Sequence, residues 1–175
     1  MIKEVSHAMQ LKLKVAASPF QAIFDSLLKL ATIVCATDYA TISLKDSYSH
    51  LFISTIVIEG MKKVPLADSF FKENNNNLLE IEDAQADNRY RDNPNVKGEP
   101  AIRFYAGVPI TMPLGEQMGT ICVFGKTPKL LNTHQKQALI GISKTVLDTI
   151  IAQEFALKQL VNLAEDKSIK ENHLI

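Results

Sequence analysis

The feature that most constrains the fold is a helical pattern that runs without a breaker from Thr133 to Glu165. Its apolar residues recur at intervals of three or four, and no Gly or Pro follows Gly141 within the pattern. Asn132 and Gln135 have the spacing of a capping box at its start. At about 1.5 Å per residue this helix would be on the order of 50 Å long, so we expect it to overhang any single domain.

Two more helices are expected near the start of the chain. Apolar residues at intervals of three or four mark a short amphipathic helix over residues 1–17, with the stripe Ile2, Val5, Met9 and Leu13. The next helix should run to about Cys35. Its predicted start has Ser18 as N-cap, Pro19 at the first helical position and Gln21 at the capping-box position. Its wide apolar stripe is suited to covering a sheet.

Between the helices, β-branched and alternating runs predict antiparallel strands. Tyr39–Leu44 and Leu51–Ile58 form one expected hairpin, and Ile102–Ile110 and Met118–Phe124 form a second, with a small strand at Leu78–Ile81. Antiparallel hairpins with helices segregated to one face give an α+β layer. The roughly forty residues between the two hairpins are rich in loops, which is uncommon in a compact domain and typical of a functional lid.

Composition and charge narrow the class of partner. The 175 residues contain 19 basic and 19 acidic side chains and are 46% hydrophobic, which suits one globular domain with a helical appendage. A balanced charge predicts neither nucleic acid nor an anionic membrane as a partner. No apolar run is long enough for a membrane span and no signal-peptide core is present, so we expect a cytoplasmic protein. Cys35 and Cys122 are expected to be free thiols.

Several local sequences together resemble a known family. They are Ser69-Phe70, Asp83-Ala84, Asp87-x-Arg89-Tyr90, Asn93-Pro94, the block from Gly98 to Ile110, Gly119 to Val123, Pro128 to Leu131, and Gln135. From about Pro19 to Ile151 the chain resembles a bacterial GAF domain of the sensor type.

The resemblance implies a sheet of five to six antiparallel strands. The terminal helices would pack on one face, with a loop-rich lid and a small-molecule pocket on the other. It divides the chain into an N-terminal amphipathic helix over 1–17, a GAF domain over 18–152, and a helical extension and tail over 153–175. Domains of this family usually sense or transmit and seldom catalyse.

Strand alternation predicts which side chains line the pocket. If Ile42, Val108, Ile121 and Val123 face the helices, the opposite face presents Thr41, Ser43, Arg103, Tyr105, Thr120 and Cys122. The register of the 102–110 strand is open at this stage, because Phe104 and Ala106 could also face inward. With lid residues added, the candidate ligand-binding set is Thr41, Ser43, Phe70, Asp83, Tyr90, Arg103, Tyr105, Thr120 and Cys122.

Each candidate also has a structural interpretation. Arg103 could bind an anionic ligand, but an ion pair with Asp83 or Asp87 is the more common arrangement. Tyr105 could stack on a ligand or belong to the core. A buried Cys122 would be an inert thiol. The lid residues Asp83, Asp87 and Arg89 would hold the loop through turns and salt bridges, and Tyr90 and Phe70 would anchor it in the core.

The sequence does not match the motifs of a phosphate-binding loop, a metal site, bilin attachment or cysteine-based reduction. Gly125-Lys126-Thr127 lacks the glycine spacing of a phosphate-binding loop, and the four histidines are dispersed, so we predict no metal site. Bilin-binding relatives carry a pocket cysteine, and this chain has Phe71 at the corresponding place and no Cys-His dipeptide. Free methionine sulfoxide reductases of this fold need a cluster of cysteines, which two distant thiols do not supply. We therefore expect no cofactor and no catalytic residues.

The leading hypothesis is a non-enzymatic sensory or regulatory module. It would bind an unknown small molecule between sheet and lid, form a homodimer through its terminal helices, and signal to a downstream effector as in two-component-like regulation. Two alternatives stay open. One is a thiol-based redox enzyme that uses Cys122, and the other is a ligand-free GAF platform for assembly.

Overall fold

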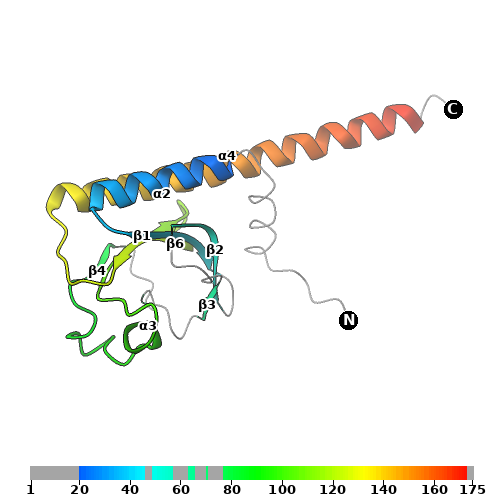
Figure 1. Cartoon of the computed structure of the whole chain (residues 1–175). Coiled ribbons are helices and arrows are strands. Elements are labelled where there is room, and N and C mark those ends of the chain that lie inside the picture. Colours follow the sequence, from blue (N-terminus) through cyan, green and yellow to red (C-terminus); the bar gives the residue numbers. More distant parts are fainter. Residues whose placement is uncertain (1–19, 46–48, 57–62, 66–69, 71–76, 173–175) are drawn as a thin grey trace, which may run out of the picture.

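A computed structural model describes residues 20–45, 49–56, 63–65, 70 and 77–172 of the chain. A single sheet forms one layer, and two helices, α2 (Gln21–Cys35) and α4 (Thr133–Asn172), lie side by side across one of its faces (Figure 1). A short helix, α3 (Pro94–Lys97), lies on the other side of the sheet. The predicted helix over 1–17 falls outside the described residues.

The sheet has six antiparallel strands in the order β3-β2-β1-β6-β5-β4. Their bounds are β1 Tyr39–Lys45, β2 Ser49–Ile56, β3 Lys63–Pro65, β4 Leu79–Ile81, β5 Phe104–Thr111 and β6 Gln117–Gly125. The predicted α+β architecture, both hairpins and the small strand are confirmed. Strand β3, which pairs with β2 at one edge, was not predicted.

The start of α2 differs from the prediction. The helix begins at Gln21, and Phe20 occupies the N-cap position without a side-chain cap. Gln21 donates from Nε2 to Asp25 Oδ1 one turn later, at 2.9 Å, and Ser18, its predicted capping-box partner, lies outside the described residues. At the other end the prediction is confirmed, because Cys35 is the last helical residue and Ala36 takes a left-handed conformation with φ of 49°.

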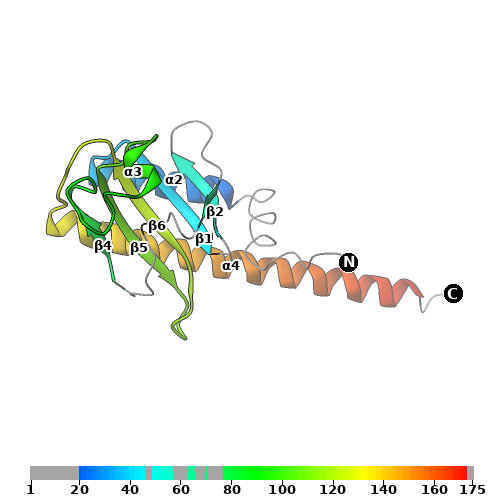
Figure 2. The same ribbon diagram turned by 90° about the horizontal axis from the view of Figure 1, so that it is seen from below.

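Helix α4 begins as predicted. Asn132 donates its backbone N–H to Gln135 Oε1 at 3.0 Å, and Gln135 donates its own to Asn132 Oδ1 at 2.9 Å, which is the expected capping box. The helix continues beyond the predicted Glu165 to Asn172, a total of 40 residues or about 60 Å. Its second half extends past the sheet, as predicted (Figures 1 and 2).

The main core lies between the sheet and the two long helices. Ile42, Val108, Ile121 and Val123 are buried there, as predicted, against fully buried residues of the helices: Phe24, Leu28, Leu139 and Val146. Phe104 and Ala106 belong to the same cluster. The even-numbered residues of β5 therefore face the helices, which settles the open register and places Tyr105 on the opposite face.

Candidate functional site

The face of the sheet opposite the long helices carries a second, smaller cluster of buried side chains. We call this the lid face, and Figure 2 views the molecule from this side. The cluster joins strand residues to the loop-rich segment and consists of Phe70, Ile81, Ala84, Val96, Ile102, Tyr105, Cys122 and Phe124. Predicted candidates from both the strands and the loop therefore meet on this face.

Hydroxyl and thiol groups occupy the centre of the lid face. Cys122 of β6 lies opposite Thr41 of β1, and Thr41 Oγ1 and Cys122 Sγ share a hydrogen bond at 3.0 Å. In a neighbouring cross-strand pair, Ser43 donates from Oγ to the carbonyl oxygen of Thr120 at 3.4 Å. All four residues are at most 7% exposed. We call them the hydroxyl row, and their alternation was predicted from the strand pattern.

The side chain of Tyr105 lies flat over a glycine. A Cβ atom placed on Gly107 would be 2.5 Å from Tyr105 Oη and 2.9 Å from its ring, so only glycine leaves room for the ring there. Gly107 is also the β5 partner of Cys122, which brings the phenol to the end of the hydroxyl row. Burial, and then the neighbouring Cys122, raise the pKa of Tyr105 well above its ordinary value.

Cys122 has the surroundings of an unreactive thiol. Burial raises its pKa, and the hydrogen bonds with Thr41 and Tyr105 only partly oppose that rise. A thiol that stays protonated at neutral pH is a poor nucleophile. The structure thus places Cys122 in the candidate site as a hydrogen-bonding group.

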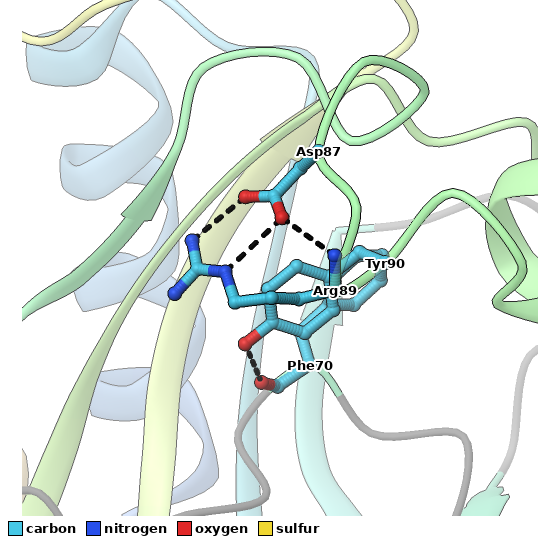
Figure 3. A network of polar contacts seen from close by, with 4 residues as sticks. All are labelled: Phe70, Asp87, Arg89 and Tyr90. Atoms are coloured by element: carbon cyan, nitrogen blue, oxygen red, sulfur yellow. Dashed lines mark hydrogen bonds and ion pairs between the residues drawn. The ribbon is translucent and has the colours of Figure 1, made fainter.

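An aromatic stack connects the lid to Tyr105. The Phe70 ring packs on Tyr105 with centroids 4.8 Å apart and planes at 16°, and Tyr90 packs on Phe70 at 5.4 Å. Tyr90 also donates from Oη to the backbone oxygen of Phe70 at 3.1 Å (Figure 3). Phe70 and Tyr90 are therefore the loop anchors that the sequence predicted.

An ion pair between Arg89 and Asp87 lies beside Tyr90, at the outer end of the aromatic stack. Arg89 lies 5.0 Å from the centre of the Tyr90 ring and donates from Nε and Nη2 to the two carboxylate oxygens of Asp87, at 3.0 and 2.7 Å. The backbone N–H of Arg89 also donates to Asp87 (Figure 3). The side-chain hydrogen bond from Arg89 lowers the pKa of Asp87. The predicted local role of these two residues is confirmed.

Asp83 and Arg103 have structural partners. Asp83 accepts a hydrogen bond from the backbone N–H of Gln85 at 3.0 Å, which stabilises a turn, as its structural interpretation predicted. The predicted ion pair of Arg103 with Asp83 or Asp87 is wrong. Arg103 donates from Nη1 to the carbonyl oxygens of Val96 and Ile102, at 3.0 and 3.1 Å. Its cation thus fastens the end of α3 to the start of β5.

Sequence reasoning missed three residues on this face. Tyr39 and Phe124 stack with centroids 5.5 Å apart, beside the hydroxyl row. They share the parity of Thr41 and Cys122, so strand alternation could have identified them. Gln117 donates from Nε2 to Thr120 Oγ1 at 3.3 Å. It lies beyond a register shift in the β5–β6 pairing, which simple alternation does not reveal.

In the part of the chain that the structure describes, no three or more His, Cys, Asp or Glu side chains gather in a way that could hold a metal ion. Within the same residues, no helix combines the length and apolarity needed to cross a membrane.

Two long helices on one face of an antiparallel sheet and a loop-rich segment on the other define an α+β domain of layered architecture. The family model of the GAF domain matches residues 19–146, and the chain belongs to this family. A cyclic di-GMP phosphodiesterase of Pseudomonas aeruginosa is 37% identical over 109 residues, which are 61% of this chain. They are only 18% of the relative, so the chain spans less than a fifth of that protein's length.

Solved structures show the same fold at low identity. The GAF domain of a phosphoenolpyruvate-protein phosphotransferase from Coxiella burnetii is 14% identical, with a TM-score of 0.64 over 86% of this chain and 98% of that one. The GAF domain of PixJ from Thermosynechococcus elongatus is 14% identical, with a TM-score of 0.63 over 83% of this chain and 92% of that one. At these identities the likeness shows the fold alone.

Proposed function

We propose that the chain is a non-enzymatic sensory GAF domain that binds a small molecule on the lid face and transmits its presence through the long helices. The observation that carries this proposal is the hydroxyl row, with Tyr105 at its end. Buried hydroxyl and thiol groups contribute less to a core than apolar groups of the same shape, and they supply the directional contacts that recognise a ligand.

The chemistry of the row favours an uncharged, polar ligand with an apolar side. Thr41, Ser43, Thr120 and Cys122 offer donors and acceptors, and Tyr105 offers a ring and a phenol. Of the cations described on this face, Arg103 is bonded to carbonyl oxygens and Arg89 is paired with Asp87. A neutral molecule would gain hydrogen bonds here without leaving a buried charge unpaired.

Transmission would pass through a homodimer built on the helices. Large apolar side chains are exposed on α2 and on the overhanging part of α4, among them Ile33 at 76%, Phe155 at 64% and Leu160 at 63%. Such a surface is unusual for a monomer and suits a second copy. A rigid helix shared by two subunits would carry a change of state from the domain to an effector.

The downstream effector would act in signal transduction. A region similar to this chain forms 18% of the cyclic di-GMP phosphodiesterase of Pseudomonas aeruginosa. We propose an output of that class, and a location in the cytoplasm. On this proposal the chain itself senses and the effector does the chemistry.

Two other functions predict different outcomes. A ligand-free assembly platform is favoured by the aromatic stack, because Phe70 and Tyr105 fill part of the lid face with the protein's own side chains. A redox enzyme acting through Cys122 is disfavoured by the raised pKa of that thiol. A Cys122→Ser variant with unchanged ligand binding and signalling would exclude the redox enzyme.

Mass spectrometry of the protein purified under native conditions tests the proposal. We expect a retained small molecule in the wild type and its loss in Thr41→Val, which removes one hydroxyl of the row at nearly constant shape. Thr145→Val is the matched control, because the Thr145 hydroxyl bonds within α4 and is exposed. No retained molecule in any of the three proteins would support the platform instead, and equal retention in all three would contradict binding at the hydroxyl row.

A further inference from the structure

The first turn of α4 is attached to the edge strand β4 through one carboxylate. Glu80 accepts a hydrogen bond at Oε1 from the backbone N–H of Leu131, at 2.8 Å, and at Oε2 it pairs with Lys136 at 2.5 Å. Leu131 lies just before α4 and Lys136 lies in its first turn, so both contacts fix the start of the helix. We call this arrangement the Glu80 clamp.

Strand β4 connects the clamp to the lid face. Leu79 and Ile81 pack in the lid-face cluster with Phe70 and Tyr105, and Glu80 lies between them in the strand. Since successive side chains of a strand point to opposite faces, β4 holds the lid cluster on one face and the clamp on the other. A displacement of β4 therefore acts on both.

The connection between β6 and α4 has little freedom to absorb such a displacement. The backbone N–H of Lys129 donates to the carbonyl oxygen of Glu82 at 3.1 Å, just after β4. Gln135 donates from Nε2 to the carbonyl oxygen of Val34 at 3.0 Å, at the end of α2. The start of α4 is thus bonded to the edge strand and to the neighbouring helix.

The clamp is better shielded than the ion pairs on the lid surface. The Glu80 side chain is 13% exposed and that of Lys136 is 35% exposed. The pair between Glu99 and Lys126 is 82% and 46% exposed, at 3.3 Å. Exposed pairs of this kind contribute little, whereas a carboxylate that is mostly buried and accepts two hydrogen bonds orients its partners.

We propose that the Glu80 clamp couples the lid to the long helix, so that a rearrangement of the lid cluster shifts the start of α4 through β4. This rests on the proposed function in taking the lid as the moving part, and it needs no ligand to be tested. Coupling is reciprocal, so a change at the clamp must also alter the lid. Because α4 is one rigid rod of about 60 Å, a small tilt at its start becomes a larger displacement at its far end.

Hydrogen exchange read at single amides by NMR tests the coupling in the whole chain. Glu80→Ala removes both contacts, and we expect about tenfold faster exchange at Leu131 and at least about threefold faster exchange at the lid amides of Asp87 and Arg91. Lys136→Met breaks the clamp from the helix side and should have the same pattern. Glu99→Ala, the matched control, should change these amides by less than about twofold.

The reverse direction is tested from the lid. Tyr90→Phe removes the hydrogen bond to Phe70. We expect this substitution to speed up amide exchange more at Leu131 than at the amides of β1 and β2. Lid exchange that stays unchanged in both clamp variants would overturn the coupling, as would a uniform rise across the whole sheet. Since no ligand is added, failure of the ligand proposal would leave this result intact. Failure of the coupling would likewise leave the ligand proposal intact.

Discussion

The two faces of the same sheet differ in what they bury. Toward the helices, β1, β5 and β6 bury mainly aliphatic and aromatic side chains, such as Ile42, Phe104 and Ile121. Toward the lid, the same strands bury Tyr105 together with Thr41 and Cys122, which share a hydrogen bond. On the proposed function, the helix face supplies stability and the lid face would supply recognition, with the alternation of side chains keeping the two apart.

The largest expected effect is on the helix face. Phe104→Ala empties a fully buried site and should lower the free energy of unfolding by about 3–5 kcal/mol. On the lid face, Tyr105→Phe keeps the ring and should lower it by only about 1 kcal/mol. Urea denaturation measures both. Similar losses in the free energy of unfolding for the two variants would contradict the assignment of stability to the helix face.

The next effect concerns the spacing of the two central strands. A Cβ on Gly119 would lie 2.0 Å from the backbone oxygen of Ser43, which cannot move aside without separating β1 from β6. Gly119→Ala should lower stability by about 2–3 kcal/mol. Gly141→Ala, whose Cβ would enter open space on α4, should raise it by about 0.5–1 kcal/mol. Melting temperatures that move in the same direction for both would refute this explanation.

A smaller effect is expected within the hydroxyl row. Thr41→Val removes the partner of Cys122 at nearly constant shape and should lower the free energy of unfolding by about 1 kcal/mol. The exposed Thr145→Val should change it by less than about 0.5 kcal/mol. If Thr41→Val kept its stability but lost the ligand, the hydroxyl row would contribute to binding and not to stability, and the two faces would differ more clearly.

The last effect is confined to alkaline pH. Burial raises the pKa of Cys35 to about 11 from 9.0, and the nearby Lys129 opposes the shift. The folded state then holds a proton that the unfolded state has released, so stability is complete below pH 9 and falls as the pH rises toward 11. Denaturation between pH 8 and 11 should show this slope, and Cys35→Ala should flatten it. An identical slope in the variant would assign the pH dependence to other groups.

Local patterns explain which features could be predicted. Period-two alternation placed Ile42 and Thr41 on opposite faces, and the capping box of Asn132 and Gln135 depends on residues three apart. The predicted Arg103 ion pair failed and the Glu80 clamp was not predicted, because neither contact carries a local signal. Arg103 bonds to backbone carbonyls, which every residue has, and Glu80 reaches Lys136 across more than fifty positions. Such contacts follow from the closed fold and not from spacing in the sequence.

Ligand recognition by the lid face is tested most directly by NMR titration of the protein with a library of uncharged metabolites. For a bound compound we expect the largest amide shifts at Thr41, Thr120, Cys122 and Tyr105, with the outer surfaces of α2 and α4 unchanged. Shifts confined to those helix surfaces, or no compound that shifts the hydroxyl row, would contradict a recognition face beneath the lid.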